Sequence, residues 1–169
     1  MAILSLLWLL VLPAAAQPWT AKVVGVADGD TITVLQGTKQ TKIRLHGIDC
    51  PEKKQDYGQK AKTFTSDACF GKTVRILPKD TDRYGRTVAV VLLDDGRSLN
   101  LELLRAGLAW HYRQYSSDSD YAQAEKTAKA GGFGLWQDKN PVPPWDFRKG
   151  KRQGQTIRRS PARTCPASK

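Results

Sequence analysis

The chain has 169 residues and a formal net charge of +11, from 27 Lys and Arg against 16 Asp and Glu. This length predicts one domain with a buried core, and the charge favours a polyanionic partner, either nucleic acid or an anionic membrane surface. The three cysteines are an odd number without a CxxC spacing, which argues against both a disulfide framework and a zinc site.

The first 16 residues have the pattern of an export signal. Residues 3–12 are almost wholly apolar, Pro13 interrupts the run, and residues 14–16 are three alanines suited to cleavage. The apolar run has about half of the roughly 20 residues that a membrane-spanning helix needs, although no Lys or Arg precedes it. We therefore expect residues 1–16 to be a signal peptide and the mature protein to be secreted or periplasmic. An uncleaved apolar leader is the alternative.

Strand patterns dominate the start of the expected folded domain, residues 17–144. β-branched residues are frequent, and turns such as Asp-Gly separate the runs, which is the pattern of short consecutive strands. In the third run apolar and basic side chains alternate with period two. The predicted strands cover residues 21–27, 31–36, 40–46, 73–77 and 87–93.

Helical spacing appears between the third and fourth of these strands. Tyr57, Ala61, Phe64 and Ala68 form an apolar stripe, and Gly71 ends it. Cys69 falls at the end of this stripe, which indicates a core position.

Two further helices are predicted after the strands. Asn100 has the position of a cap for a short helix over residues 101–106. Ser117 and Asp120 have the spacing of a capping box for a helix that runs to Ala130. The order of elements predicts an α+β protein, a five-stranded Greek-key barrel of the OB type with about three helices. A generic α+β sheet is the alternative.

The last 25 residues form a basic tail. Residues 145–169 carry eight Lys or Arg and one Asp, with few large apolar residues and no clear period. This composition predicts a disordered, solvated segment, and a dedicated binding arm is the alternative.

Carboxylates stand at the ends of two predicted strands. Asp30 begins the second strand and Asp49 follows the third, so both can approach one cation that prefers oxygen ligands, such as Ca²⁺. Glu52 lies three residues further on, where a carboxylate can act as general base on a water molecule. An Asp-Gly turn and an exposed loop glutamate are the structural alternatives.

Two arginines accompany these acids. Arg44 is on the strand that leads to Asp49, and Arg86 follows a Tyr-Gly turn. Paired guanidinium groups neutralise charge that develops on phosphoryl oxygens. Acids and arginines together favour the cleavage of phosphodiesters.

Three short segments, residues 28–31 (DGDT), 44–52 (RLHGIDCPE) and 82–86 (DRYGR), in this order, resemble the staphylococcal (micrococcal) nuclease family. The similarity runs from about residue 21 to residue 136. It implies an OB-fold barrel with three helices and Ca²⁺-dependent hydrolysis of DNA and RNA, with single strands preferred and products that end in 3′-phosphates. We also expect a monomer with no dedicated protein partner and no stable membrane insertion.

The resemblance also implies a role for individual residues. Asp30 and Asp49 would hold Ca²⁺ through their side chains and Cys50 through its backbone carbonyl, with Asp28 as an acid near the metal. Glu52 would be the general base, Arg44 and Arg86 would stabilise the phosphate, and Arg83 and Tyr84 would bind substrate. The family's base-stacking tyrosine matches Tyr112 or Tyr115, and the tail after Pro144 lies outside the resemblance.

Two other functions are compatible with the sequence. His46 and His111, the only histidines, would suffice for metal-free acid–base ribonuclease chemistry. A non-catalytic OB barrel would bind single strands through basic and aromatic side chains, but it would not need the acids that this chain retains.

Overall fold

The computed structural model describes residues 17–154, and the side chains of residues 17–150. The predicted signal peptide and residues 155–169 of the tail lie outside this part of the chain.

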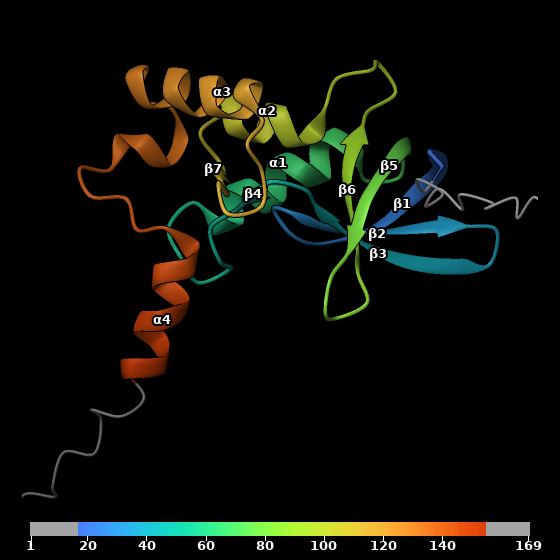
Figure 1. Cartoon of the computed structure of the whole chain (residues 1–169), viewed down its shortest axis with the longest axis horizontal. Helices are drawn as coiled ribbons and strands as arrows, with labels where there is room; N and C mark the ends of the chain where they lie inside the picture. Colours follow the sequence, from blue (N-terminus) through green and yellow to red (C-terminus); the bar gives the residue numbers. More distant parts are fainter. Residues whose placement is uncertain (1–16, 155–169) are drawn as a thin grey trace, which may run out of the picture.

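Five strands close into a barrel (Figure 1), in the order β1-β2-β3-β6-β5. Neighbours are antiparallel except β3 and β6, which run parallel and are separated in the chain by β4, α1 and β5. This mixed barrel confirms the predicted OB-type architecture. The strands are β1 (Trp19–Asp28), β2 (Thr31–Gln36), β3 (Lys39–Leu45), β5 (Thr73–Thr81) and β6 (Thr87–Leu92).

The barrel encloses the alternate apolar side chains of its strands. Ile43 and Leu45 point inward from β3, whereas Lys42 before them is exposed and Arg44 between them is half-buried. This period-two burial is what the alternation in the sequence predicted. The fully buried core includes Val23, Ile32, Val34, Ile43, Ile76 and Val91.

Three helices cover one end of the barrel (Figure 1): α1 (Gly58–Cys69), α2 (Leu99–Arg105) and α3 (Ser119–Ala130). All three were predicted, but two caps differ. Ser98 caps α2, and its hydroxyl accepts from the N–H of Leu101, while Asp118 caps α3. A 3₁₀ turn, Gly134–Gln137, follows α3.

Asn100 does not cap α2. It is buried, and its side chain links α2 to the barrel by hydrogen bonds. Its Oδ1 accepts from the N–H of Val91 at 3.0 Å, and its Nδ2 donates to the carbonyl of His46 at 3.0 Å. A buried amide satisfies backbone groups on β6 and in the turn after β3 here, which is why the polar residue sits inside the first turn of the helix.

A fourth helix, α4 (Pro144–Gly154), occupies the start of the predicted disordered tail. In Figure 1 it projects away from the barrel, beyond β4 (Ile48–Asp49) and β7 (Trp110–His111). The prediction of disorder is therefore wrong for residues 145–154. A local reason for this helix is Pro144, because proline suits the first position of a helix. In residues 17–154 no helix combines the length and apolar content that crossing a bilayer requires.

Candidate functional site

Asp30 lies in a tight turn between β1 and β2 that is pressed against α1. The hydroxyl of Thr65 on α1 donates to the carbonyl of Gly29 at 2.6 Å. A Cβ on Gly29 would lie 2.7 Å from Ala61 Cβ and 2.9 Å from Cys50 Sγ, so this close approach requires glycine. The turn therefore holds Asp30 in a fixed place, where it is 2% exposed.

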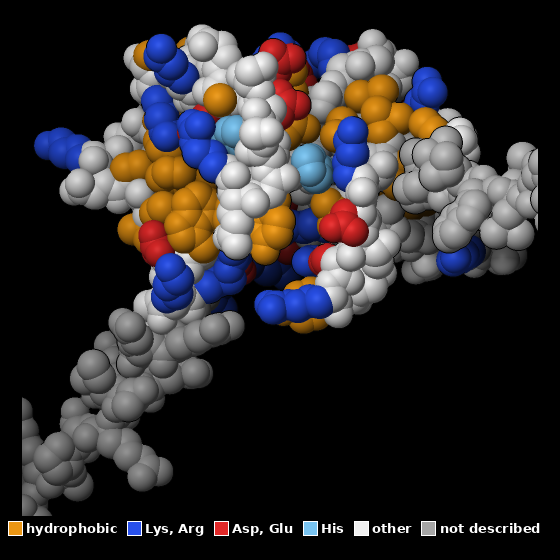
Figure 2. Space-filling model, viewed as in Figure 1, with side chains coloured by type: hydrophobic (Ala, Val, Ile, Leu, Met, Phe, Trp, Pro, Cys, Tyr) orange, Lys and Arg blue, Asp and Glu red, His pale blue; other side chains and the backbone are white. Residues whose placement is uncertain are grey.

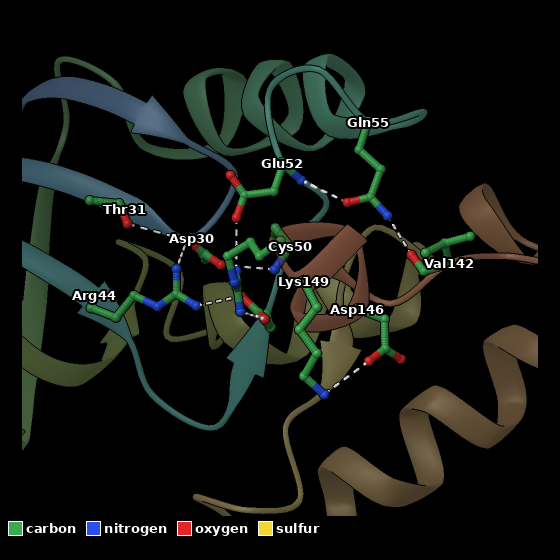
Figure 3. Close-up of polar contacts among 11 residues, drawn as sticks. Asp30, Thr31, Arg44, Cys50, Glu52, Gln55, Val142, Asp146 and Lys149 are labelled. Carbon is green, nitrogen blue, oxygen red and sulfur yellow. Dashed lines mark hydrogen bonds and ion pairs between the residues drawn. The ribbon is translucent and has the colours of Figure 1, made fainter. Parts of the chain in front are cut away.

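The strand register brings Arg44 to this turn. Thr31 of β2 is paired with Arg44 of β3, so the arginine lies beside Asp30. Its guanidinium donates to the carboxylate of Asp30 through Nη1 (Figure 3), and to Asp49 Oδ1 through Nη2 at 2.6 Å. The predicted approach of Asp30 and Asp49 is thus present as a shared arginine contact.

Asp49 belongs to the short strand β4, which pairs with β7 rather than with the barrel. Asp49 is fully buried, with 0% of the residue exposed. The next residue, Cys50, donates its backbone N–H to Asp30 Oδ2 at 2.8 Å. The Cys50 thiol is buried and free, and burial raises its pKa well above the usual value. Its side chain is therefore an unreactive packing group.

The charge on Asp30 is not fully balanced by the protein. Burial raises the pKa of Asp30 from 3.8 to about 6; Arg44 opposes this rise, and the nearby Asp28 carboxylate adds to it. Asp28 Oδ1 is itself buried and without a hydrogen-bond partner within residues 17–154. Two adjacent acids, one with an unpaired buried oxygen, form a place where a cation is favourable.

Side chains alone do not complete a metal shell. Within the described part of the chain, no three His, Cys, Asp or Glu side chains gather closely enough to hold a metal ion. A cation on Asp30 and Asp49 would depend on backbone carbonyls and water for its remaining ligands, which Ca²⁺ accepts readily. The donor set therefore fits a hard divalent cation of this kind.

Glu52 reaches the same cluster from the loop before α1. Its carboxylate contacts Arg148 of α4, with Glu52 Oε1 2.8 Å from Nη1 of the arginine. Arg148 also donates to Asp49 Oδ2 at 2.8 Å through Nη2. Sequence reasoning missed Arg148, although a proline followed by two aromatic residues within the basic tail was a signal that this segment folds.

Arg86 lies apart from the acids, at the start of β6. Its Nε donates to Asp82 Oδ2 at 2.6 Å. Burial acts to raise the pKa of Asp82, but hydrogen bonds from Arg86 outweigh it and keep that pKa below its usual value. Arg44 of β3 pairs with Val88 of β6, two residues after Arg86, so the two arginines come from neighbouring strands of the barrel.

Arg83 and Tyr84 occupy the tip of the hairpin between β5 and β6. The Tyr84 ring is 69% exposed, and the guanidinium groups of Arg83 and Arg86 lie 4.9 and 5.5 Å from its centroid. The hairpin thus presents an aromatic face flanked by two positive charges.

Of the two histidines, His111 is a buried part of the fold and His46 is half-buried. His111 is 3% exposed, and its Nε2 lies 2.9 Å from the carbonyl oxygen of Ser116. Burial lowers the pKa of both His46 and His111. A neutral, buried His111 has no access to substrate, which weakens the metal-free alternative.

The candidate base-stacking tyrosines differ in their surroundings. Tyr112 is stacked on Trp145 of α4, with ring centroids 5.1 Å apart and planes 13° apart. Tyr115 is 62% exposed and meets Tyr112 edge-on at 4.8 Å. On the face in Figure 2, Lys and Arg side chains lie beside exposed apolar ones, and acidic side chains are interspersed among them.

The fold and the sequence motifs agree with one family. The profile of the family described as Staphylococcal nuclease homologue matches residues 42–138, which is more than half of the chain. The chain belongs to the staphylococcal nuclease family. The match includes Arg44, Asp49, Glu52 and Arg86, and it ends before α4.

Relatives within the staphylococcal nuclease family cover most of the chain. An "Uncharacterized endonuclease" of Haemophilus influenzae is 48% identical over 131 residues, which are 77% of this chain and 73% of the relative. A second protein of that name, from Escherichia coli O157:H7, is 44% identical over 127 residues, 75% of this chain and 83% of its own. A "Micrococcal nuclease" of Shigella flexneri is 34% identical over 158 residues, 88% and 91% of the two chains.

Proposed function

We propose that this protein is a Ca²⁺-dependent endonuclease that hydrolyses the phosphodiesters of DNA and RNA, with single strands preferred. Membership of a nuclease family and similarity to proteins named as endonucleases support the nuclease activity. The observation that carries the proposal is the contact of Arg44 with two buried acids, Asp30 and Asp49, beside the more exposed Glu52. Metal-assisted hydrolysis of a phosphodiester needs acids that hold a cation, an acid that acts as general base, and an arginine that binds the phosphate.

Asp30, Asp49 and the backbone carbonyl of Cys50 would hold the Ca²⁺. When bound, the cation supplies positive charge that polarises the phosphoryl group and lowers the cost of its negative charge. The nearly complete burial of both acids fixes their side chains, and a bound cation would compensate the carboxylate charge that burial makes unfavourable.

Glu52 would accept a proton from the attacking water. The water oxygen forms a new bond to phosphorus, the bond from phosphorus to the 5′ oxygen breaks, and the leaving oxygen takes up a proton, so the product keeps a 3′-phosphate. With 36% of its side chain exposed, Glu52 is accessible to water, unlike Asp49. This difference in exposure supports separate roles for the two carboxylates.

Arg44 and Arg86 would bind the phosphoryl oxygens from two neighbouring strands of the barrel. Arg44 donates both of its terminal nitrogens to Asp30 and Asp49 here, so a phosphate has to share or replace these contacts. Arg83 and Tyr84, at the hairpin tip, would bind the neighbouring part of the nucleic-acid strand. Tyr115 is exposed, whereas Tyr112 is stacked on Trp145, so Tyr115 is the better candidate to stack on a base.

We also propose export on the basis of the apolar leader, residues 3–16. Fractionation of cells that express the full chain, followed by N-terminal sequencing, tests it. Mature protein that starts at Gln17 in the periplasm or medium supports export, and retention of the full chain in the cytoplasm contradicts it.

Cleavage of denatured DNA by the purified protein, with Ca²⁺, with Mg²⁺ and with EDTA, tests the proposed reaction. We expect fragments with 3′-phosphate ends in Ca²⁺ and none in EDTA. Activity that survives EDTA would move the chemistry to the histidines, and binding without cleavage in every condition would leave a nucleic-acid-binding barrel.

The variant Glu52→Gln tests the assignment of the base. It removes the proton acceptor while keeping the size of the side chain, so kcat should fall by about 10²-fold or more with little change in DNA binding. Glu102→Gln on α2, whose carboxylate pairs with Arg97 and Arg105, is the matched control and should leave kcat unchanged. A Glu52→Gln enzyme as fast as wild type would exclude this residue as the base.

A further inference from the structure

Arg148 bridges the two acids to which the proposed function gives different roles. Its Nη2 lies 2.8 Å from Asp49 Oδ2, and its Nη1 lies 2.8 Å from Glu52 Oε1. It comes from α4, beyond the residues 42–138 that match the family profile, and 96 residues after Glu52 in the chain. Nothing in the motifs around the acids predicts a third arginine at this place.

Contacts other than the ion pairs hold α4 on the site. Pro144 is buried, and the Trp145 ring stacks on Tyr112 at 5.1 Å and meets the edge of Trp110 at 5.8 Å. Trp145 and Arg148 are three residues apart, so they share one face of the helix. The aromatic contacts therefore direct the guanidinium to the acids.

The chain just before α4 is also tied to the loop that carries Glu52. The side chain of Gln55 donates to the carbonyl of Val142 (Figure 3), while its Oε1 accepts from the N–H of Glu52 at 3.1 Å. Phe147 of α4 lines a pocket together with Pro51 and Tyr57 on either side of Glu52. The position of the Glu52 loop and the position of α4 are thus linked.

The shortest contacts of the two Asp49 oxygens are with different arginines. Arg44 donates to Oδ1 at 2.6 Å, and Arg148 donates to Oδ2 at 2.8 Å and, at the longer distance of 3.4 Å, to Oδ1. The acid that is proposed to bind the cation is therefore already neutralised by two positive charges. Glu52 is 36% exposed, and the ion pair with Arg148 fixes the direction of its carboxylate. One guanidinium therefore has two effects, one on charge and one on geometry.

We propose that Arg148 is a positioning residue of the active site, which rests on the proposed nuclease function. It holds the Glu52 carboxylate beside Asp49 in the orientation for proton transfer, and its charge opposes the binding of the divalent cation. Removal of its side chain then weakens catalysis and strengthens cation binding at the same time. A residue that only stabilised the fold would not move these two quantities in opposite directions.

The experiment compares Arg148→Ala, Arg148→Lys and Lys149→Ala in the full chain. Isothermal titration calorimetry gives the Kd for Ca²⁺ without nucleic acid, and cleavage of denatured DNA at saturating Ca²⁺ gives kcat and KM. Lys149 is the matched control, because it is the next cation on α4 and pairs with Asp146 instead of the acids of the site.

Arg148→Ala should bind Ca²⁺ several-fold to about tenfold more tightly, because one nearby positive charge is lost. Its kcat should fall by about 10- to 100-fold, as is usual when the partner that orients a functional group is removed, and KM should change less. Added guanidinium ion should restore part of kcat. Arg148→Lys keeps the charge but not the planar fork, so its Kd should stay near the wild-type value while kcat falls. Lys149→Ala should match wild type in both.

Arg148→Ala with unchanged kcat, or with equal or weaker Ca²⁺ binding, overturns the proposal. Circular dichroism confirms that each variant is folded, and Arg148→Lys serves if the alanine variant is not. A wild-type protein that binds Ca²⁺ but cleaves nothing refutes the proposed hydrolysis alone, while the calorimetric comparison still decides the effect of the charge. Absence of Ca²⁺ binding in wild type and Arg148→Ala alike overturns both proposals.

Discussion

The guanidinium of Arg44 lies 2.6 Å from Asp49 Oδ1, across the turn that separates β3 from β4. The same side chain contacts Asp30, and both acids are almost fully buried. Arg44 is thus a structural counterion as well as a candidate phosphate ligand, and these two roles can be separated by experiment.

Arg44→Ala should destabilise the protein by about 3 kcal/mol in EDTA, because removal of one partner leaves buried carboxylates uncompensated. Ca²⁺ should recover much of this loss, since the cation replaces the missing charge. Urea unfolding with and without Ca²⁺ measures both, and Arg75→Ala, an exposed arginine on β5, is the control. Equal destabilisation in Ca²⁺ and in EDTA would contradict a cation site at these acids.

Asn100→Ala should lower the free energy of unfolding by about 2 kcal/mol. The substitution leaves the buried N–H of Val91 and the carbonyl of His46 without their side-chain partner. Chemical denaturation measures the change, with the exposed Asn140→Ala as a control expected to stay within about 0.5 kcal/mol of wild type. A loss as small as that of the control would show that water or a backbone shift replaces the amide.

His111→Gln should reduce the dependence of stability on pH below 6.5. Burial holds the pKa of His111 below its ordinary value of 6.5, and its Nδ1 is buried without a partner among the described residues. The stability from neutral His111 is therefore fully present above pH 6.5 and is lost as the pH falls toward the folded-state pKa. Gln cannot be protonated, so the variant lacks this loss.

Urea unfolding of wild type and His111→Gln at pH 7.5, 6.5 and 5.5 tests this. Asp30 acts in the opposite sense, because its pKa is raised to about 6 and the associated stability is lost as the pH rises through that value. Both proteins contain Asp30, so subtracting one profile of unfolding free energy against pH from the other removes the contribution of Asp30. Parallel pH profiles for both proteins would mean that His111 titrates normally in the folded state.

Replacement of the four Lys and Arg in residues 155–169 by Gln should weaken nucleic-acid binding and its salt dependence. Each lost phosphate contact on a single strand lowers the slope of log K against log salt by about 0.7. Fluorescence titration at several salt concentrations gives the slope, and exchange of each of the four for the other basic residue, Lys for Arg or Arg for Lys, is the control. An unchanged slope in the Gln variant would show that these charges do not touch the nucleic acid.

Local sequence patterns predicted most of the barrel. β2 coincides with the predicted residues 31–36, because β-branched residues between an Asp-Gly turn and a glycine leave few alternatives. The caps of α2 and α3 were misplaced by one or two residues, since several neighbouring residues there are able to cap and only tertiary contacts choose among them. Asn100 is the clearest case, because its side-chain amide accepts a hydrogen bond from the barrel strand β6 and does not cap the helix.

The sequence by itself determined the order of the elements, the alternation that fills the barrel, and the motifs that contain Asp30, Arg44, Asp49 and Glu52. Only the tertiary structure decided that Arg44 lies between two acids and that α4 brings Arg148 to Glu52. The physical reason is the separation along the chain of the residues that interact. Periodicity and turn chemistry act between residues a few positions apart, whereas an ion pair between residues 96 positions apart depends on the packing of Trp145 against Tyr112.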